Sequence, residues 1–580
     1  MAGGLLNIVS VGNNNTILTG NPTKTFFKVT YSKYSNFGLQ KFRIDYNGLR
    51  ELRLNEQSTF SFKIPRYADL LMDTYIVVTL PDIWSPIHHP TEASTDTDTG
   101  ITTIGTLFRW VPYEFRWIKN IGTHMIKEIE ITCGSMTLQK YSGEYIAAMV
   151  ERDFSEEKKD LFNKMTGNIN ELNDPANSGT RINTYPSAYY STSTDGAEPS
   201  IRGRNLYIPL NSWFTLNNGS AFPLIALQYN ELNINVTMRP IRELFQVRDP
   251  YDYQNFYPYM QPDFNQSQFQ MYRYLQTPPA VDISTDNYQN KVSTWNADVH
   301  LMATYCFLSK EEASMFAAKD QVYLIKDIHQ YTFENITGTK KLKIDTNGMV
   351  ASWMWYLQRN DANLRNEWSN YTNWPYRNLP RDIDVYRQAD VEYEDPDKTI
   401  PINAINVSTQ NYGDVVSQPN IHPDENQPSG ISTTGAYAVE NRRHILETMG
   451  ILLDGEYREN ILTHGIYEYV EKYTRTKGNA QDGLYCYNFC LNTNPFDYQP
   501  SGAINLSKFK NIELELTTYT PPIDDINSQF DVICDLEGNP IGVRKSNWRL
   551  YDYNYNLVLF EERYNVLSFI GGNCGMLYAK

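Results

Sequence analysis

The sequence has few cysteines, an excess of acidic over basic residues and no long hydrophobic run. Six cysteines among 580 residues are too few for a disulfide scaffold, so we expect all six to be free thiols in a reducing compartment. The net charge of −16 argues against a protein that coats nucleic acid, because neutralisation of phosphates dominates such binding. The densest apolar run, Tyr75–Leu80, ends at Pro81 and is far too short to span a membrane. The N-terminus has neither a basic leader nor a glycine at position 2, so we expect a soluble protein made in the cytosol.

Sequence motifs of catalysis are also missing. The chain contains no G-x-S-x-G, no P-loop lysine motif and no H-E-x-x-H. The sequence does not exclude a pair of catalytic carboxylates, as in glycoside hydrolysis, because any two of 67 acidic residues could meet in the fold. We predict no catalytic residue, no cofactor-binding residue and no cofactor.

Two groups of residues could bind a metal, but the sequence signal for a metal site is weak in both. Cys486 and Cys490 would share one face of a strand, but a zinc site needs four ligands, usually as two spaced pairs, so we expect both in the core. His88 and His89 precede a loop that lacks the final glutamate of an EF-hand, although it contains three acids, Glu92, Asp96 and Asp98. A solvated loop is the simpler interpretation, and we predict no metal-binding residue.

Sequons for N-glycosylation are frequent in this Asn-rich chain, yet a cytosolic protein does not meet the usual glycosylation machinery. They occur at Asn14, Asn218, Asn235, Asn265, Asn335, Asn370, Asn406 and Asn505. We interpret most of them as chance and assign no glycosylation site.

The chain is rich in aromatic residues and in β-strand patterns. Leu232, Ile234, Val236 and Met238 alternate with polar residues, which predicts a strand with one buried and one solvated face. The preceding stretch, 222–229, is apolar on both sides and predicts a strand covered on both faces. Similar patterns predict strands at 27–31, 42–46, 60–64, 75–80, 129–133, 205–214, 298–307, 328–333, 342–344, 350–357, 466–470, 484–491, 512–516 and 555–560. Such a pattern over this length indicates two large β-sandwiches.

A few short helices interrupt the strands. Tyr145–Val150 has helical spacing, and Ser155 begins a second helix that Gly167 ends. Ser309 begins a third helix, with Met315 and Phe316 facing inward.

We expect an N-terminal arm over 1–25, a first domain over 26–260, a linker over 261–282 and a second domain over 283–580. The acidic stretch 361–438 should form a long exposed loop, because its burial would leave backbone groups without partners.

Several stretches resemble the major capsid proteins of the nucleocytoplasmic large DNA viruses, in the order of that family. The opening from Met1, with 18–37, resembles the family's start, and 223–235 resembles the end of its first jelly roll. In the second half the similar stretches are 366–372, 499–502 with Asn505 and Ser507, 564–567 and 571–572. The resemblance covers the chain from end to end. It implies an all-β fold with a few short helices, made of two consecutive eight-stranded antiparallel jelly-roll sandwiches with long loops.

The function that the resemblance implies is structural and non-enzymatic. The chain would form homotrimers, pseudo-hexagonal capsomers that tile an icosahedral shell, with neighbouring capsomers and minor capsid proteins as partners. It would make no direct contact with nucleic acid and would meet an internal membrane only indirectly. Its place would be the virion, after synthesis and assembly in the host cytoplasm. The alternatives are a minor capsid protein of the same fold, and a carbohydrate-binding or glycoside-cleaving β-sandwich, for which a secretion signal and a Trp-lined cleft would be expected.

Overall fold

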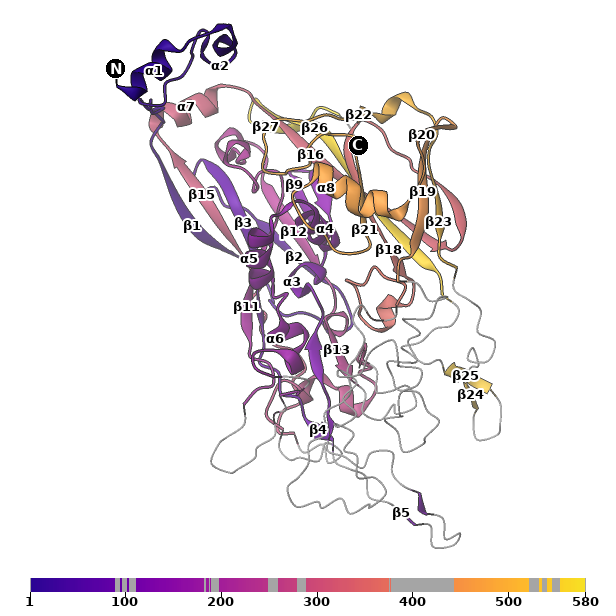
Figure 1. Ribbon diagram of the computed structural model, residues 1–580. Helices are drawn as coiled ribbons and strands as arrows, with labels where there is room; N and C mark the ends of the chain where they lie inside the picture. The colour runs from indigo at the N-terminus through magenta and orange to yellow at the C-terminus, as the bar shows by residue number, and fades with distance from the viewer. Residues whose placement is uncertain are drawn as a thin grey trace.

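The computed structural model shows an elongated protein built mainly from antiparallel sheets (Figure 1). It describes residues 2–88, 94–95, 102–103, 111–181, 184–186, 188, 198–248, 259–278, 288–374, 376, 443–520, 531–534, 540–544 and 553–578. Among these residues no helix has the length and apolar character needed to cross a bilayer.

The first half of the chain forms two four-stranded sheets. One has the order β1-β15-β3-β11, with the strands Phe37–Asp45, His300–Leu308, Leu70–Leu80 and Arg204–Pro209. The other has the order β10-β9-β12-β2, with the strands Met136–Tyr141, Ile126–Cys133, Leu232–Met238 and Ser58–Lys63. A smaller sheet joins β14 (Tyr259–Met260), β13 (Phe245–Arg248) and β8 (Phe115–Trp117).

The second half repeats this plan. One sheet follows the order β16-β26-β18-β21, with the strands Gln321–Ile336, Tyr555–Ile570, Met349–Arg359 and Leu484–Asn488. Two short strands extend it, β22 (Ile504–Asn505) and β27 (Asn573–Met576). The other sheet has the order β17-β23-β19-β20, with the strands Thr339–Lys343, Ile512–Thr518, Leu446–Leu453 and Glu456–Thr463.

Strand order is the same in both halves. When the eight strands of the main sheets are counted along the chain, each half pairs them as 1-8-3-6 in one sheet and 2-7-4-5 in the other. Consecutive strands therefore alternate between the two sheets at most steps, which is the winding of a jelly roll. The predicted pair of sandwiches is confirmed.

The expected boundary between the halves was wrong. We expected 298–307 to open the second domain, but β15 pairs along its length with β1 and with β3, so it is the last strand of the first half. The expected linker is also wrong as a spacer, since Phe269, Met271 and Tyr274 are buried in the first core. The chain leaves the first sandwich after Leu308, and α7 (Lys310–Ala318) leads to β16. The sequence suggested a boundary because proline and glutamine interrupt the strand pattern there. After this interruption, however, the chain returns to the first sandwich and adds its last strand.

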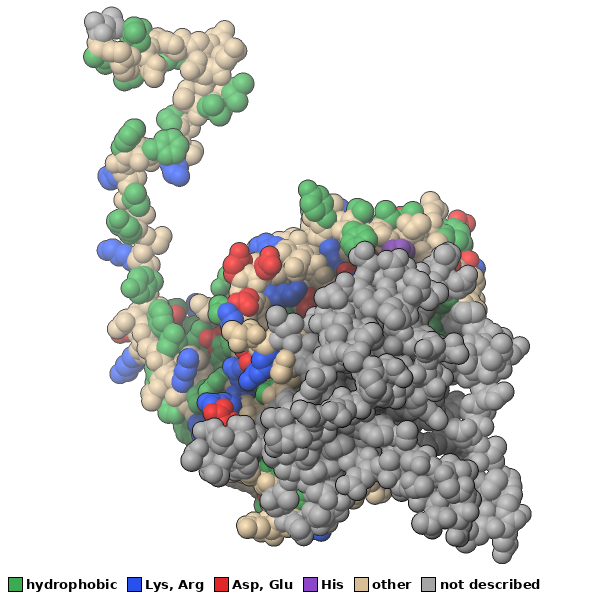
Figure 2. Space-filling view, turned by 60° about the horizontal axis from the view of Figure 1, so that its bottom comes forward, with side chains coloured by type: hydrophobic (Ala, Val, Ile, Leu, Met, Phe, Trp, Pro, Cys, Tyr) green, Lys and Arg blue, Asp and Glu red, His purple; other side chains and the backbone are tan. Residues whose placement is uncertain are grey.

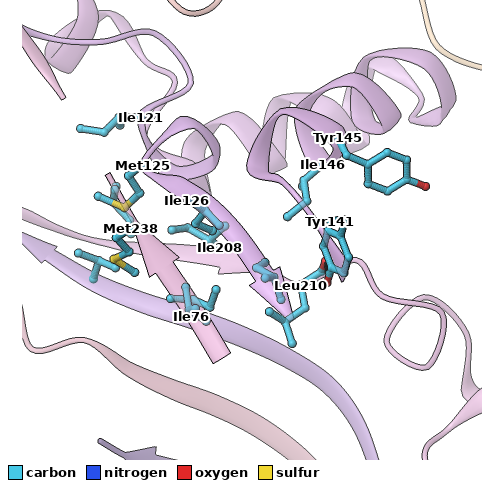
Figure 3. Packing of buried hydrophobic residues seen from close by; sticks show 14 of the residues in the cluster. Ile76, Ile121, Met125, Ile126, Tyr141, Tyr145, Ile146, Ile208, Leu210 and Met238 are labelled. Atoms are coloured by element: carbon cyan, nitrogen blue, oxygen red, sulfur yellow. Dashed lines mark hydrogen bonds between the residues drawn. The ribbon is translucent and has the colours of Figure 1, made fainter. Parts of the chain in front are cut away.

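The first core lies between its two sheets. Figure 3 shows side chains from β3, β11, β9 and β12 converging with those of α3 (Ile121–His124) and α4 (Gly143–Asp153). The strict alternation predicted for β12 is present, because every second residue from Leu232 to Met238 is buried. The preceding stretch is not a strand: it contains one bridge at Phe222 and a 3-10 turn over Leu224–Ala226. Pro223 lacks the backbone donor that a central strand requires, yet Phe222 and Leu224 are still buried.

Helices follow the predictions in part. α4 and α5 (Glu156–Thr166) lie where we expected them, and Gly167 ends α5 in the left-handed region with φ of 80°. Ser309 caps α7 through a hydrogen bond from Glu312, but Met315 is exposed instead of facing inward. Besides 222–229, two more predicted strands are absent: 27–31 is unpaired, and Ile466–Val470 is a π-helical turn that continues into α8 (Glu471–Arg475).

The two sandwiches pack directly against each other. β18 of the second half is buried on both faces along most of its length, and β26 is buried on both faces over residues 559–563. Trp353, Trp355 and Leu557 point into the second core, whereas Met354 and Phe560 join the core of the first half. The apolar contact between the halves is therefore continuous with the first core, and it joins the two sandwiches over a wide area.

Candidate functional site

Buried charges mark the contact between the two sandwiches. Arg152, at the end of α4, is fully buried, and its Nη2 lies 2.7 Å from Asp153 Oδ2 and 2.8 Å from Glu562 Oε1 of β26. Arg152 Nη1 donates to Ser352 Oγ of β18, and Tyr145 Oη donates to Glu562 Oε1. A guanidinium with its fork of donors satisfies two carboxylates at once, so the charges are paired inside a dry interface. We call these five residues the charged junction.

Ionisation of Glu562 depends on that pairing. Burial opposes the charged form of the carboxylate, but the positive charges of Arg152 and Lys326 and the hydrogen bonds from Ser352 and Tyr145 outweigh it and lower the pKa of Glu562 to about 2. Both sandwiches must therefore be in place for this carboxylate to remain charged without large cost.

A second contact between the halves comes from the segment 366–374. Asn366 has a left-handed backbone, with φ of 54°, and its Nδ2 donates to the carbonyls of Arg242 and Phe245 at 2.8 Å each. Trp368 Nε1 donates to the carbonyl of Glu243, and the Arg239 guanidinium lies 4.1 Å from the Trp368 ring centre. These bonds satisfy backbone groups of the first half with side chains of the second.

The start of the long acidic stretch is buried, which corrects our expectation of an exposed loop for that part. Asp361 accepts hydrogen bonds from Arg359 and Arg365, and all three side chains are nearly inaccessible. Burial opposes the charge of Asp361, but the two guanidinium groups hold its pKa well below the ordinary value. We expected exposure from the acidic composition of the stretch, but composition does not show that arginines inside the protein pair with this aspartate. Beyond residue 374 the stretch up to 438, apart from Tyr376, lies outside the described residues.

The N-terminal arm has the opposite character. Every residue from 2 to 36 is exposed, including α1 (Gly3–Val9) and α2 (Thr16–Thr19). Figure 2 shows the arm extending away from the body with hydrophobic side chains along it. The exposed apolar residues are Leu5, Leu6, Ile8, Val9, Val11, Ile17, Leu18, Phe26, Phe27, Val29, Tyr31 and Tyr34. The arm is longer than the 25 residues that we expected, because β1 begins only at Phe37.

The candidate metal ligands named from the sequence and the sequon at Asn370, where the structure describes their side chains, take part in packing and hydrogen bonding within the fold. Cys486 and Cys490 are both buried, as expected for the core, and Cys133, Cys306 and Cys574 are free thiols like them. His88 lies at the end of a two-residue strand, while Cys534, His89 and the acids after it lie outside what the structure describes in side-chain detail. The Asn370 side chain is buried and bonded to Thr372 and Trp374, which leaves no room for a glycan.

One group of possible metal ligands was missed. His444, His464 and Glu468 bring their ligand atoms within 4.8 Å of one another. His464 and Glu468 are four residues apart, a spacing that places both on one face of a helix. The predicted strand over 466–470 concealed this signal, because in a strand residues four apart are too distant to share a ligand.

Comparison with known proteins agrees with this architecture. The family described as "Major capsid protein N-terminus" matches residues 25–307, and "Large eukaryotic DNA virus major capsid protein" matches 312–575. The gap between the two matches, residues 308–311, lies at the end of β15 and the start of α7, where the chain passes from one sandwich to the other.

Relatives match over the whole chain at low identity. The major capsid protein of Phaeocystis pouchetii virus is 24% identical, covering 99% of each chain, and that of Paramecium bursaria Chlorella virus 1 is 24% identical over 100% of each. Among solved structures, PBCV-1 VP54 has a TM-score of 0.56 at 18% identity, covering 96% of this chain and 100% of the other. The Faustovirus major capsid protein has a TM-score of 0.55 at 13% identity, covering 98% of each chain. With the matched family models, the strand order and the ordered sequence similarity, the chain belongs to the family of major capsid proteins of the nucleocytoplasmic large DNA viruses.

Proposed function

We propose that this major capsid protein acts as a homotrimer, which forms a pseudo-hexagonal capsomer in the icosahedral shell of a large DNA virus. The observation that carries the proposal is the identical strand order of the two sandwiches within one chain. Three chains then supply six similar units around a threefold axis, and closed symmetry satisfies their contact surfaces without open-ended growth. Neighbouring capsomers and minor capsid proteins are the partners, and the protein has no enzymatic role.

A rigid subunit supports this role. A capsomer keeps its outline only if the two sandwiches hold one relative orientation. The continuous apolar contact and the charged junction make sliding of one sandwich over the other costly. Such a displacement would leave a buried guanidinium and a buried carboxylate without their charged partners.

The N-terminal arm supports assembly by contacts outside its own subunit. Twelve large apolar side chains that find no cover within the described chain are costly in water, so residues 2–36 would order against a neighbouring subunit or the underside of the shell. The arm and the C-terminus lie at the same end of the molecule in Figure 1, and we assign this end to the interior of the shell. The net charge of −16 fits a shell protein that stays apart from the genome, with assembly in the host cytoplasm.

A carbohydrate-binding sandwich is less well supported. Such a protein would present tryptophans in an open cleft, yet the tryptophans of known burial are all buried or half-buried, and Trp117, Trp353 and Trp355 lie inside the cores. Negative-stain imaging of the purified protein separates the two functions. Compact particles with threefold symmetry and a hexagonal outline are expected, whereas isolated two-lobed monomers under all conditions would contradict the proposal.

A further inference from the structure

Three segments of the second sandwich converge on one carboxylate. Glu468 lies on the π-helical turn Ile466–Val470, which sits between β20 and α8, and its side chain is fully buried. His464 precedes it by one turn, directly after β20, and His444 lies two residues before β19. Gly483, directly before β21, donates its backbone N–H to Glu468 Oε1 at 2.8 Å. With φ of 81° this glycine approaches closely where a side chain would clash with the Tyr371 carbonyl.

The second oxygen of Glu468 faces both imidazoles. Glu468 Oε2 lies 3.1 Å from His464 Nδ1 and 3.4 Å from His444 Nδ1. The two rings are stacked, with centres 4.5 Å apart and planes 25° apart. Ligands held at about 2.0–2.1 Å from one metal ion in a tetrahedral site lie about 3.3 Å apart. Both distances from Glu468 Oε2 are therefore already close to the spacing that a shared cation would impose, and all three ligand atoms lie within 4.8 Å of one another.

We propose that His444, His464 and Glu468 form a binding site for one divalent transition-metal cation of the Zn²⁺ class. Two imidazoles and one carboxylate suit such ions, whereas Mg²⁺ and Ca²⁺ require oxygen ligands. The imidazoles are partly open to solvent, with side-chain exposures of 35% and 29%, which provides an entry path and leaves room for water as a fourth ligand. Arg443, the cation next to His444, is paired with Asp482 at 3.1 Å.

A metal here would join segments that are distant in sequence. It would tie the start of β19 to the end of β20 and to the turn that carries Glu468, which the Gly483 N–H already holds against β21. The site would thus stabilise one end of the second sandwich. This inference is independent of the proposed capsomer, because it concerns binding within a single chain.

The test uses the full-length protein without a histidine tag, stripped of metal and titrated with Zn²⁺ and, for its visible absorption, with Co²⁺. One equivalent per chain should bind, and His464→Gln or His444→Gln should weaken binding at least 10- to 100-fold, by analogy with the losses seen even for supporting residues. His329→Gln is the matched control, since His329 also faces a carboxylate, that of Asp327 at 3.2 Å, but no second histidine joins this pair in the described part of the chain. Absence of a one-equivalent site, or equal affinity in His464→Gln and the wild type, would overturn the proposal.

A second readout needs no variant. Zn²⁺ should protect His444 and His464, but not His329, from chemical modification by diethyl pyrocarbonate, as read by mass spectrometry. Mg²⁺ at the same concentration should protect none of them. Equal modification of His444 and His464 with and without Zn²⁺ would also refute the site.

Discussion

Arg152 lies on the first sandwich, yet it donates hydrogen bonds to Ser352 and Glu562 of the second. Replacing it with methionine leaves Glu562 charged and without its main partner in a dry interface. We expect Arg152→Met to lower the free energy of unfolding by about 3–5 kcal/mol, measured by urea denaturation with tryptophan fluorescence. Arg53→Met is the control, because Arg53 forms an exposed pair with Glu56 and should change stability by less than about 1 kcal/mol. Equal effects of the two variants would contradict the role of the junction.

The pKa of Glu562 predicts how stability depends on pH. The folded-state pKa, about 2, lies below the ordinary value of 4.5, so the stabilisation is complete above pH 4.5 and is lost as the pH falls through about 2. A shift of this size corresponds to about 3 kcal/mol. Between pH 4.5 and 2 the Glu562→Gln variant should lose less stability than the wild type. The measurement is the urea midpoint across this window, and parallel curves for the two proteins would be evidence against the assignment.

Asn366 offers a test of the second contact between the halves. Asn366→Ala removes the two hydrogen bonds that the Asn366 amide donates to carbonyls of the first half, and it places alanine in the left-handed region, so we expect a loss of about 2–4 kcal/mol in urea unfolding. Asn335→Ala is a matched control, because Asn335 has a similar φ of 59° but is exposed. If both variants lose the same stability, backbone strain alone explains the effect and the contact contributes nothing.

At the scale of elements, the local patterns were sufficient where one face of an element is buried. Alternation identified β12 and β23, and the serine and glycine signals identified the ends of α5. They failed where partners are distant in sequence. Nothing local shows that β15 returns to lie between β1 and β3, or that Asp361 meets two arginines inside the protein.

The missed histidine cluster has a similar cause. The five residues 466–470, of which four are apolar or aromatic, fit a strand and a helical turn equally well, and only packing against β21 decides between them. Had a helix been expected, His464 and Glu468 would have been recognised as a pair on one face. The partner His444, twenty residues earlier, is visible only in the folded chain.

Deletion of the arm tests its role in assembly separately from its role in folding. Residues 2–36 are all exposed and cover none of the described core, so deleting them should change the free energy of unfolding by less than about 0.5 kcal/mol. Assembly into larger particles should nevertheless be lost or strongly reduced, as seen by sedimentation. The control is a full-length protein with Leu161→Ser, which removes an exposed apolar side chain of the body. Normal assembly of the truncated protein would show that the arm has no partner.

At the scale of the whole molecule, charge predicts how contacts respond to salt. Subunits of net charge −16 repel one another over roughly 10 Å at 0.1 M salt. Contacts between capsomers should therefore strengthen as salt rises, whereas more apolar interfaces inside a capsomer should change little. Sedimentation across ionic strength checks this, and dissociation of the smallest stable particle by moderate salt would contradict it.

The native mass of the purified full-length protein tests the capsomer most directly. A chain of 67.2 kDa predicts a trimer of 3 × 67.2 = 201.6 kDa as the main species over a wide range of protein concentration. Mass photometry or native mass spectrometry resolves this from a monomer and from a dimer. A single species at 67.2 kDa under all salt conditions would contradict the proposed capsomer.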